Sequence, residues 1–193
     1  MAGIVLAGGR SNRMGTDKAL LPWRGSTLLA HVCRMVSEAC GSATVVAESS
    51  DRFVKAELPP HTRVVADLYP GLGPLGGIVT GLRAAGEGIH VVTACDMPFI
   101  RAELLRFLLS EADGWDTAIP EIDGHLQPLC AAYDSRCADT LESRLLAGER
   151  SVQSAVSALN LKVIPPPPLL AVDPDLVSFT NINTPEQYAN LHA

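Results

Sequence analysis

Residues 4–18 read IVLAGGRSNRMGTDK, and they introduce a pattern that the next hundred residues repeat. Residues 4–7 are apolar and are followed at once by Gly8 and Gly9, as expected of a short buried strand that ends in a turn. Further apolar runs of strand length occur at residues 43–47, 63–66 and 90–94. Helical patterns separate or follow these runs, at residues 28–39, at 51–58, from after Gly77 to about Ala85, and at 101–112. This alternation predicts an α/β fold with a mostly parallel central sheet and helices on both faces.

The second half of the chain is less regular. Residues 117–120 and 128–133 are predicted strands joined by a turn at Asp123-Gly124, so we expect an antiparallel portion of the sheet in the C-terminal half. Helices are expected at residues 136–147 and 151–159, an extended polyproline connector at 165–168, and a short strand and turn at 178–183. Thr184, Pro185 and Gln187 then predict the cap and first turn of a last helix. No repeat or linker divides the chain, which predicts a single domain over residues 1–193.

The composition excludes several classes of protein. The chain has 193 residues, of which 47% are hydrophobic, 19% are charged and 5% are aromatic, and its net charge is −6. Such a chain can bury a core, so general disorder is not expected. An acidic chain without a basic block is a poor partner for nucleic acids or for an anionic membrane. No apolar run reaches the roughly 20 residues of a membrane helix and no basic leader is visible, so we expect a cytoplasmic protein.

The cysteines carry no recognisable motif. They occur in separate segments, with no C-x-x-C pair and no mixed cysteine and histidine spacing of a zinc site, at Cys33, Cys40, Cys95, Cys130 and Cys137. Apolar or small residues flank each of them. We therefore expect buried free thiols in a reducing compartment.

Positive charge gathers directly after the first predicted strand, at Arg10, Arg13 and Lys18. Ligands of open α/β folds bind at the carboxyl edge of the parallel strands, and Gly8 and Gly9 leave backbone N–H groups there open to an anion. Together these features predict a phosphate-binding site. The stretch is not a Walker P-loop, because that motif requires lysine directly after its last glycine.

Two acidic residues follow later strands. Asp67 comes after residues 63–66, and Asp96 follows residues 90–94 within the sequence C-D-M-P. Both carboxylates are expected at the same sheet edge as the basic stretch. Beside a bound polyphosphate, a carboxylate such as that of Asp96 would hold Mg²⁺, which prefers oxygen ligands. The alternative for each aspartate is a structural role, in which the carboxylate caps the following turn.

Residues 71–76 match a competing motif. They read GLGPLG and fit G-x-G-x-x-G, and Asp96 follows at the spacing of a dinucleotide-binding fingerprint. This pattern would indicate an NAD(P)-dependent oxidoreductase. Against it, Leu68-Tyr69-Pro70 separates the strand from the first glycine, where the fingerprint has a tight turn, and the basic stretch is left without a role.

The sequence resembles a known family at several points in the same order. Residues 6–18 resemble the signature of nucleotidyltransferases; residues 70–77, 95–99, 124–128 and 181–186 add a likeness to the molybdenum cofactor guanylyltransferase family, the MobA-like nucleotidyltransferases. The resemblance covers nearly the whole chain. It implies a three-layer, Rossmann-like nucleotidyltransferase fold of the GT-A type, with a nucleotide-binding half over about residues 1–100 and an acceptor-binding half over about 101–193.

The resemblance also implies a reaction. Members of the family transfer GMP from Mg-GTP to the terminal phosphate of molybdenum-bound molybdopterin and release pyrophosphate. By this likeness Arg13, Lys18 and Asp96 would be catalytic, with Asp96 and Asn183 at the Mg²⁺ ion. Asn181 and Asn183 would face the metal or the incoming acceptor. The implied nucleotide-binding residues are Leu6, Ala7, Gly8, Gly9, Lys18, Asp67 and Asp96.

Some alternatives stay open within and outside this class. The family often has an asparagine after the second strand, where this chain reads Val46-Ala47-Glu48, so CTP competes with GTP as the expected nucleotide. Cytidylyl transfer to molybdopterin and nucleotidyl transfer to a sugar phosphate are the rival reactions. A carrier that binds the cofactor without consuming GTP is a rival of another class. Apo-molybdoenzymes or their chaperones are candidate recipients of the product, and a monomer or weak oligomer is expected.

Overall fold

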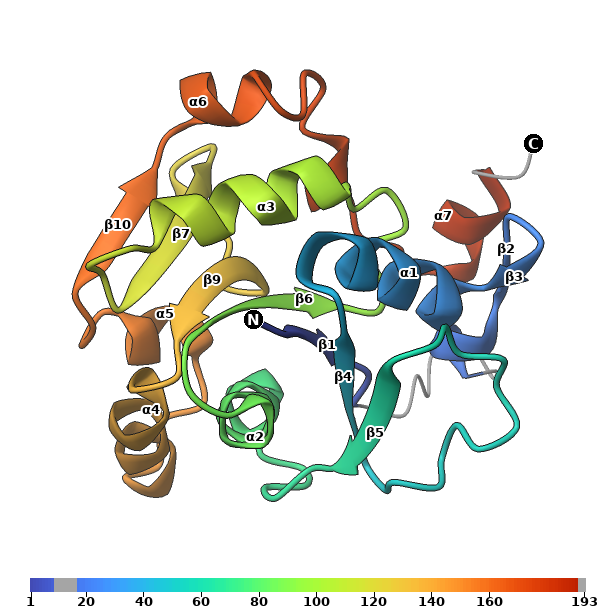
Figure 1. Cartoon of the computed structure of the whole chain (residues 1–193), viewed down its shortest axis with the longest axis horizontal. Coiled ribbons are helices and arrows are strands. Elements are labelled where there is room, and N and C mark those ends of the chain that lie inside the picture. The colour runs from blue at the N-terminus through green and yellow to red at the C-terminus, as the bar shows by residue number, and fades with distance from the viewer. Residues whose placement is uncertain (9–16, 191–193) are drawn as a thin grey trace.

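The computed structural model describes residues 1–8 and 17–190, and its centre is a mixed β-sheet (Figure 1). The strand order is β10-β7-β9-β6-β1-β4-β5, with β8 (His125–Leu126) paired to β7. The bounds are β1 (Gly3–Leu6), β4 (Ala43–Ala47), β5 (Thr62–Ala66), β6 (Ile89–Ala94), β7 (Thr117–Ile122), β9 (Cys130–Asp134) and β10 (Leu161–Ile164). Strands β5, β4, β1 and β6 are parallel, and β9 runs antiparallel to both β6 and β7. The predicted mostly parallel sheet with an antiparallel C-terminal portion is confirmed.

Helices cover both faces of this sheet, so the molecule has three layers (Figure 1). One face carries α1 (Leu28–Cys40), α3 (Ala102–Glu111) and α6 (Pro166–Leu170). The other carries α2 (Pro74–Ala85), α4 (Cys137–Leu146) and α5 (Val152–Val156). Because both faces are covered, neighbouring residues of one strand are buried on opposite sides: Val5 packs under α1, and Ile4 and Leu6 pack under α2.

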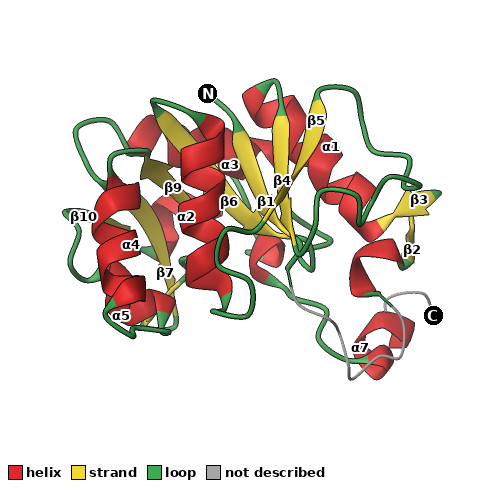
Figure 2. Ribbon diagram, turned by 90° about the horizontal axis from the view of Figure 1, so that it is seen from below, coloured by secondary structure: helices red, strands yellow, loops and turns green. Residues whose placement is uncertain are grey.

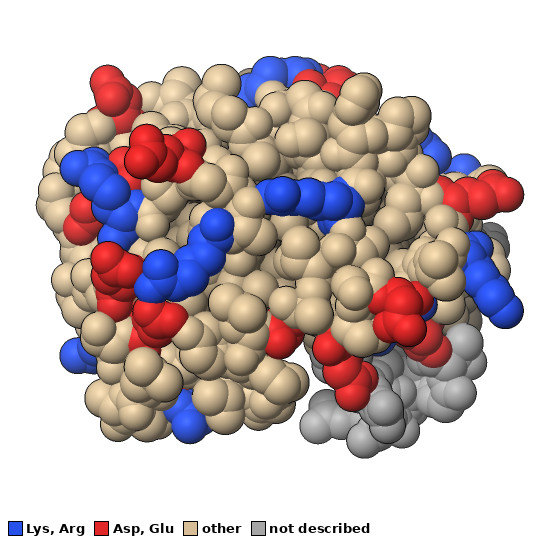
Figure 3. All heavy atoms as spheres, turned by 60° about the horizontal axis from the view of Figure 1, so that its bottom comes forward, with Lys and Arg blue, Asp and Glu red and all other residues tan. Residues whose placement is uncertain are grey.

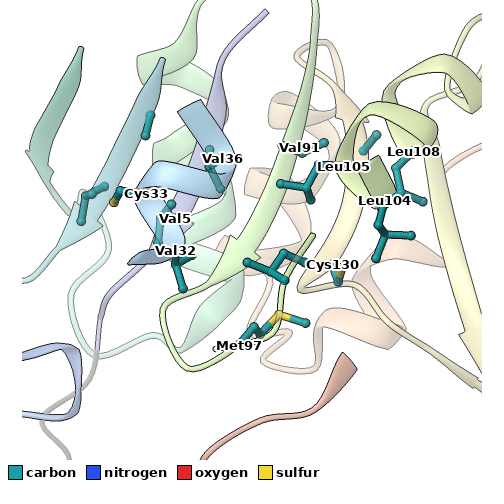
Figure 4. Close-up of a cluster of buried hydrophobic side chains, with 14 of the residues drawn as sticks. Val5, Val32, Cys33, Val36, Val91, Met97, Leu104, Leu105, Leu108 and Cys130 are labelled. Carbon is teal, nitrogen blue, oxygen red and sulfur yellow. The ribbon is translucent and has the colours of Figure 1, made fainter. Parts of the chain in front are cut away.

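The apolar spacing of α1 shows how sequence builds one of these layers. Val32, Cys33 and Val36 recur at helical intervals and are fully buried against the sheet (Figure 4). The Thr27 hydroxyl accepts a hydrogen bond from Ala30 N at 3.2 Å and so caps the start of the helix. Gly41 ends the helix with φ of +83°, which a residue with a side chain rarely adopts. Each buried valine contributes about 1.5–3 kcal/mol to folding.

Two predicted elements in less regular segments are wrong. Residues 51–58 form successive turns with hydrogen bonds such as Val54 N to Asp51 O instead of a helix. These hydrogen bonds reach back three residues, as from Arg52 N to Ser49 O and from Ala56 N to Phe53 O, and not the four of an α-helix. Residues 165–168 do not remain an extended connector, because α6 begins at Pro166. Proline is tolerated in the first helical turn, whose N–H groups have no partner within the helix, and buried Leu169 then anchors α6 to the core.

Smaller differences concern element ends. The predicted strand at 178–183 is absent; the described chain has a 3₁₀ turn, η2 (Val177–Phe179), there, and the Ser178 side chain bonds to Arg101 N and Phe99 O. Helix α2 begins at Pro74, earlier than predicted, and α5 ends at Val156, earlier than predicted. The turn at Asp123-Gly124 is confirmed, with φ of +51° and +75°, but it joins β7 to β8.

A small cluster at one end of the sheet brings the C-terminal segment back to the N-terminal one. The hairpin of β2 (Pro22–Trp23) and β3 (Ser26–Thr27) lies beside α7 (Pro185–Asn190) (Figure 2). Trp23 and Ile182 are buried together, and the Trp23 and Phe99 rings meet edge to face at 5.5 Å. Thr184 and Gln187 bond reciprocally, which confirms the predicted cap of α7. The packing of Ile182 thereby holds residues 181–183 against the sheet edge.

The surface of the described part of the chain carries mixed charge. On the face drawn in Figure 3, basic and acidic side chains are interspersed. Among the surface ion pairs, Arg83 contacts both Asp139 and Glu142. Among residues 1–8 and 17–190, no helix combines the length and the apolar character needed to cross a membrane.

Candidate active site

The carboxyl ends of the parallel strands open into a cavity of about 550 Å³. Its walls come from the ends of β1, β4 and β6, from the residue after β5, from the start of α2, and from the C-terminal half. The described lining includes Leu6, Ala7, Gly8, Val46, Asp67, Gly73, Pro74, Asp96, Leu129 and Asn181. This is the crevice at which open α/β folds bind ligands. Seven of the predicted nucleotide-site and acceptor-side residues therefore line one cavity: Leu6, Ala7, Gly8, Lys18, Asp67, Asp96 and Asn181.

Lys18 lies at the centre of a polar cluster in this cavity. It begins the 3₁₀ turn η1 (Lys18–Leu20), which Asp17 caps by accepting a hydrogen bond from Ala19 N at 3.1 Å. The Lys18 Nζ atom donates to Asp96 Oδ2 at 2.8 Å and to Asn183 Oδ1 at 3.2 Å. The Lys18 and Asp96 side chains are only 15% and 21% exposed. Three residues from distant parts of the sequence thus meet at one point.

The backbone of Asp96 explains how Asn183 reaches this point. Asp96 follows β6, and Ile182 N donates a hydrogen bond to Asp96 O at 2.9 Å. The buried side chain of Ile182 holds this contact from the other side. Asn181 and Asn183 flank Ile182 and are therefore placed beside Asp96, one lining the cavity and the other bonded to Lys18.

The oxygen atoms of this cluster suit a hard cation. Asp96 Oδ2 and Asn183 Oδ1 converge on one position, which the Lys18 ammonium fills. Asp96 Oδ1 is buried and has no hydrogen-bond partner among the described residues. A buried carboxylate oxygen without a partner is costly, and a bound cation would remove that cost. Carboxylate and amide oxygens are ligands that Mg²⁺ prefers, so these residues fit the ion.

Asp67 occupies a different wall of the cavity. Its Oδ1 atom accepts hydrogen bonds from Thr80 Oγ1 at 2.8 Å and from Tyr69 N at 3.0 Å. The strands β4 and β1 separate β5, which precedes Asp67, from β6, which precedes Asp96. At the usual strand spacing this is a separation of about 14 Å between the strand axes. The two carboxylates therefore face different parts of a ligand in the cavity.

The start of α2 completes the cavity between these walls. Close approach of α2 to β1 requires glycine, because a Cβ atom on Gly81 would lie 2.4 Å from Ile4 Cγ2. Gly73 precedes the helix with φ of +84° and provides no side-chain cap. The N-terminal N–H groups of α2 are thus left for a ligand, and they carry the positive end of the helix dipole.

This geometry rules out the dinucleotide fingerprint at residues 71–76. In that motif the strand before the glycines and the strand that ends in the acidic residue are neighbours. Here the glycines follow β5 and Asp96 follows β6, and two other strands lie between them. The sequence has the residue spacing of the dinucleotide fingerprint, but the two strands that the motif requires as neighbours are separated in the sheet.

Arg52 is a cavity residue that sequence reasoning missed. Its Nη1 atom donates to Ala7 O at 2.7 Å, and its Nε and Nη2 atoms donate to Asp17 Oδ2 at 3.1 Å and 2.9 Å. No motif marks this residue, and its segment was predicted as a helix. The only local signal in the sequence is the next residue, Phe53, an aromatic residue that the structure buries and that could have indicated that this segment packs inward.

Gly9 and Arg13 lie outside the described residues. Ala47 is fully buried in the core under α1, and neither it nor Glu48 belongs to the described cavity lining. Val46 lines the cavity from β4 instead. The nucleotide preference that residues 46–48 leave open is therefore a question for binding experiments.

The cysteines add no nucleophile to the cavity. All five are free thiols, and only Cys95 lines the cavity. Burial, followed by the negative charge of Asp96, raises the pKa of the Cys95 thiol to about 12. The thiol is therefore protonated at neutral pH, and a thiolate mechanism at this site is not supported.

The fold and the site together define a class: an α/β protein with a cavity at the carboxyl edge of a parallel sheet. In this cavity a lysine and a helix N-terminus can receive phosphates, and an aspartate can hold a metal ion. The model of the MobA-like NTP transferase domain matches residues 3–163. The chain belongs to this family and is a nucleotidyltransferase.

Similar proteins share nearly the full length of the chain. A probable molybdenum cofactor guanylyltransferase of Pelotomaculum thermopropionicum is 36% identical over 183 residues, covering 95% of this chain and 87% of that protein. The molybdenum cofactor guanylyltransferase of Desulfosudis oleivorans is 34% identical over 195 residues, covering 100% and 95%. The crystal structure of molybdopterin-guanine dinucleotide biosynthesis protein A from Archaeoglobus fulgidus has a TM-score of 0.84 and 33% identity, covering 98% and 96%.

Proposed function

We propose that this chain transfers GMP from Mg-GTP to the terminal phosphate of molybdenum-bound molybdopterin and releases pyrophosphate. The observation that carries the proposal is the meeting of Lys18, Asp96 and Asn183 in the cavity of a chain that belongs to this family. The full-length similarity to proteins named for this activity supports the choice of substrates.

The chemistry requires no side-chain nucleophile, because the attacking group is already a phosphate. An oxygen of the acceptor phosphate forms a bond to the α-phosphorus of GTP, and the bond from that phosphorus to the bridging oxygen of pyrophosphate breaks. Catalysis then consists of aligning the two phosphates and stabilising the charge that develops. A cavity lined by fixed charges, without a nucleophilic thiolate, is suited to this task.

The residues of the chain divide this work. The N–H groups at the start of α2 and the backbone of Leu6, Ala7 and Gly8 would hold the nucleotide along the strand ends. The ammonium of Lys18 would leave Asp96 and Asn183 and neutralise the triphosphate, a task that the guanidinium of Arg13 would share. Pyrophosphate would depart toward these two cations.

The wall of the cavity that carries Asp96 would hold the Mg²⁺ ion. Asp96 and Asn183 would bind Mg²⁺ through their oxygens, and the ion would supply charge neutralisation at the reacting phosphates. Asn181, which lines the cavity next to Asp96, would face the incoming acceptor. Asp67 would bind the nucleotide on the opposite wall.

Calorimetric titration of the purified protein is the first test. GTP, CTP, ATP, UTP and NAD⁺ are added separately, with and without Mg²⁺. We expect GTP to bind most tightly, and binding to weaken in Asp96→Ala and Lys18→Ala. A preference for CTP would move the assignment to cytidylyl transfer without changing the site.

A transfer assay then separates the enzyme from a carrier. The protein is incubated with α-labelled GTP and molybdenum-bound molybdopterin, and the label is followed into the dinucleotide product. We expect label transfer that depends on the acceptor and on Mg²⁺. Binding of both substrates without label transfer would contradict the proposal and would favour a non-catalytic carrier.

A further inference from the structure

Arg52 lies in the cavity wall, although its position in the sequence is outside all of the motifs. It lies in the turns that follow β4, and its side chain is only 14% exposed. The guanidinium lies over the ring of Phe53, with 5.0 Å between the charged carbon and the ring centroid. Phe53 is itself buried in the core. Packing against Phe53 therefore holds the Arg52 side chain in the orientation that reaches the cavity.

The guanidinium joins two segments of the nucleotide site. One contact is to the carbonyl of Ala7, the residue after β1. Two contacts reach one carboxylate oxygen of Asp17, which is ten residues further along the chain. All three nitrogen atoms of the side chain take part in these bonds. A lysine could not reproduce the set, because its ammonium is a single point charge without the planar fork.

Asp17 passes this restraint on to Lys18. While Oδ2 of Asp17 accepts from Arg52, Oδ1 accepts from Ala19 N at 3.1 Å and caps η1. Lys18 is the first residue of that turn, and its ammonium reaches Asp96. A chain of contacts thus runs from Arg52 through Asp17 and η1 to the pair of Lys18 and Asp96.

Arg52 also reduces the net negative charge of the cavity lining. Among the described lining residues, Asp17, Asp67 and Asp96 are acidic, and Lys18 and Arg52 are basic. Without Arg52, the carboxylate of Asp17 would stand in a partly buried site with no ion-pair partner among the described residues, and it would repel a triphosphate. The same contact therefore aligns the lysine turn and lowers the negative potential around it.

We propose that Arg52 is a positioning residue of the nucleotide site, which acts through Asp17 to hold the Lys18 turn against the end of β1. This role rests on the proposed function, because it assumes that Lys18 serves a nucleoside triphosphate. It makes Asp17 and Arg52 one functional unit, so the loss of either residue removes what the other contributes.

A double-mutant cycle tests this unit. Arg52→Ala, Asp17→Ala and the double variant are titrated with the Mg-bound nucleoside triphosphate that the wild-type protein binds most tightly. We expect Arg52→Ala to raise Kd about tenfold, on the scale of one lost charge-assisted pair. In the Asp17→Ala background the same change should raise Kd less than twofold. Arg52→Lys should recover only a small part of the loss.

Two controls separate positioning from general stability. Arg136→Ala removes a similar arginine–aspartate pair, with Asp134, at the opposite edge of the sheet, and it should leave Kd unchanged. Steady-state kinetics should show that Arg52→Ala changes kcat as well as KM, since Lys18 would be misplaced in the transition state. Melting temperatures of all variants identify any that fold poorly.

Different results would overturn different claims. Additive effects of Arg52→Ala and Asp17→Ala on Kd would mean that Arg52 contacts the nucleotide itself. An unchanged Kd with only a lowered melting temperature would mean that Arg52 merely stabilises the fold. Either result removes the positioning role and leaves the proposed function intact. A wild-type protein that binds a nucleotide other than GTP most tightly would instead remove the proposed substrate and leave the cycle valid.

Discussion

Two walls of the cavity carry an aspartate, Asp67 on one and Asp96 on the other, and the two carboxylates differ in their hydrogen-bond partners. Asp67 is held by groups close in the sequence, the N–H of Tyr69 and the hydroxyl of Thr80. Asp96 is paired with Lys18 and has one oxygen without a hydrogen-bond partner among the described residues. A carboxylate bonded to its own loop and to the helix that follows shapes a site, whereas one paired with a movable cation can exchange partners. We therefore expect the Asp96 wall to govern the chemical step and the Asp67 wall to govern nucleotide affinity.

The largest expected effect is on the Asp96 wall. Asp96→Ala and Lys18→Ala should each lower turnover at least ~100-fold, the scale of removing one charge-stabilising group. The measurement is the initial rate of label transfer at saturating GTP and acceptor. Near-normal rates in both variants would show that Asp96 and Lys18 do not take part in the chemical step.

A smaller effect is expected on the Asp67 wall. Asp67→Ala removes the acceptor of two hydrogen bonds that shape the loop before α2, and it should weaken nucleotide binding about tenfold. Turnover at saturation should change less than threefold. Asp67→Asn keeps an acceptor oxygen and serves as the matched variant. If Asp67→Ala lowers turnover as strongly as Asp96→Ala, the division between the two walls is wrong.

The pairing of Lys18 with Asp96 predicts an effect of the opposite sign. In the absence of nucleotide the ammonium occupies the position on which the two oxygens converge, so it competes with a divalent ion. Lys18→Met should therefore bind Mn²⁺ alone more tightly, by roughly fivefold, or about 1 kcal/mol. Lys162→Met breaks a comparable pair with Glu111 on another part of the surface and should leave Mn²⁺ affinity unchanged. Weaker Mn²⁺ binding in Lys18→Met would argue against this competition.

The smallest effect concerns Asp134, at the edge of the sheet opposite the two walls. Hydrogen bonds from Arg136 hold the pKa of Asp134 below its usual range. A lowered folded-state pKa stabilises the fold above the unfolded-state value of about 3.9, and this gain is lost as the pH falls through the folded-state pKa. The melting temperature of Arg136→Ala should therefore lie slightly below that of the wild-type protein at pH 7, and the two should converge below about pH 4. A gap that persists at low pH would assign the stabilisation to something other than the charge of Asp134.

The sequence predicts the parallel half of the fold well for a physical reason. Its strands are buried on both faces and read as short apolar runs, and the run at residues 43–47 coincides with β4. Lys18, Asp67 and Asp96 could be singled out because each follows such a run or the glycines that end one. Edges of parallel strands bring such residues together without further information.

The rest depends on contacts that no local pattern records. Residues 51–58 carry a helical pattern, but the structure places Arg52 on a turn because its partners, Ala7 and Asp17, lie far away in the sequence. Pro166–Leu170 is a helix because the core receives Leu169. Asn183 reaches Lys18 across 165 positions through the packing of Ile182, and only the family resemblance pointed to it.

Electron paramagnetic resonance of bound Mn²⁺ tests most directly whether the two walls divide the work. The spectra of the wild-type protein, Asp96→Ala and Asp67→Ala are recorded with saturating GTP. We predict that the protein-bound Mn²⁺–nucleotide signal is altered in Asp96→Ala and keeps its wild-type form in Asp67→Ala. A signal that is unchanged in Asp96→Ala and altered in Asp67→Ala would contradict the account and would assign the ion to the other wall.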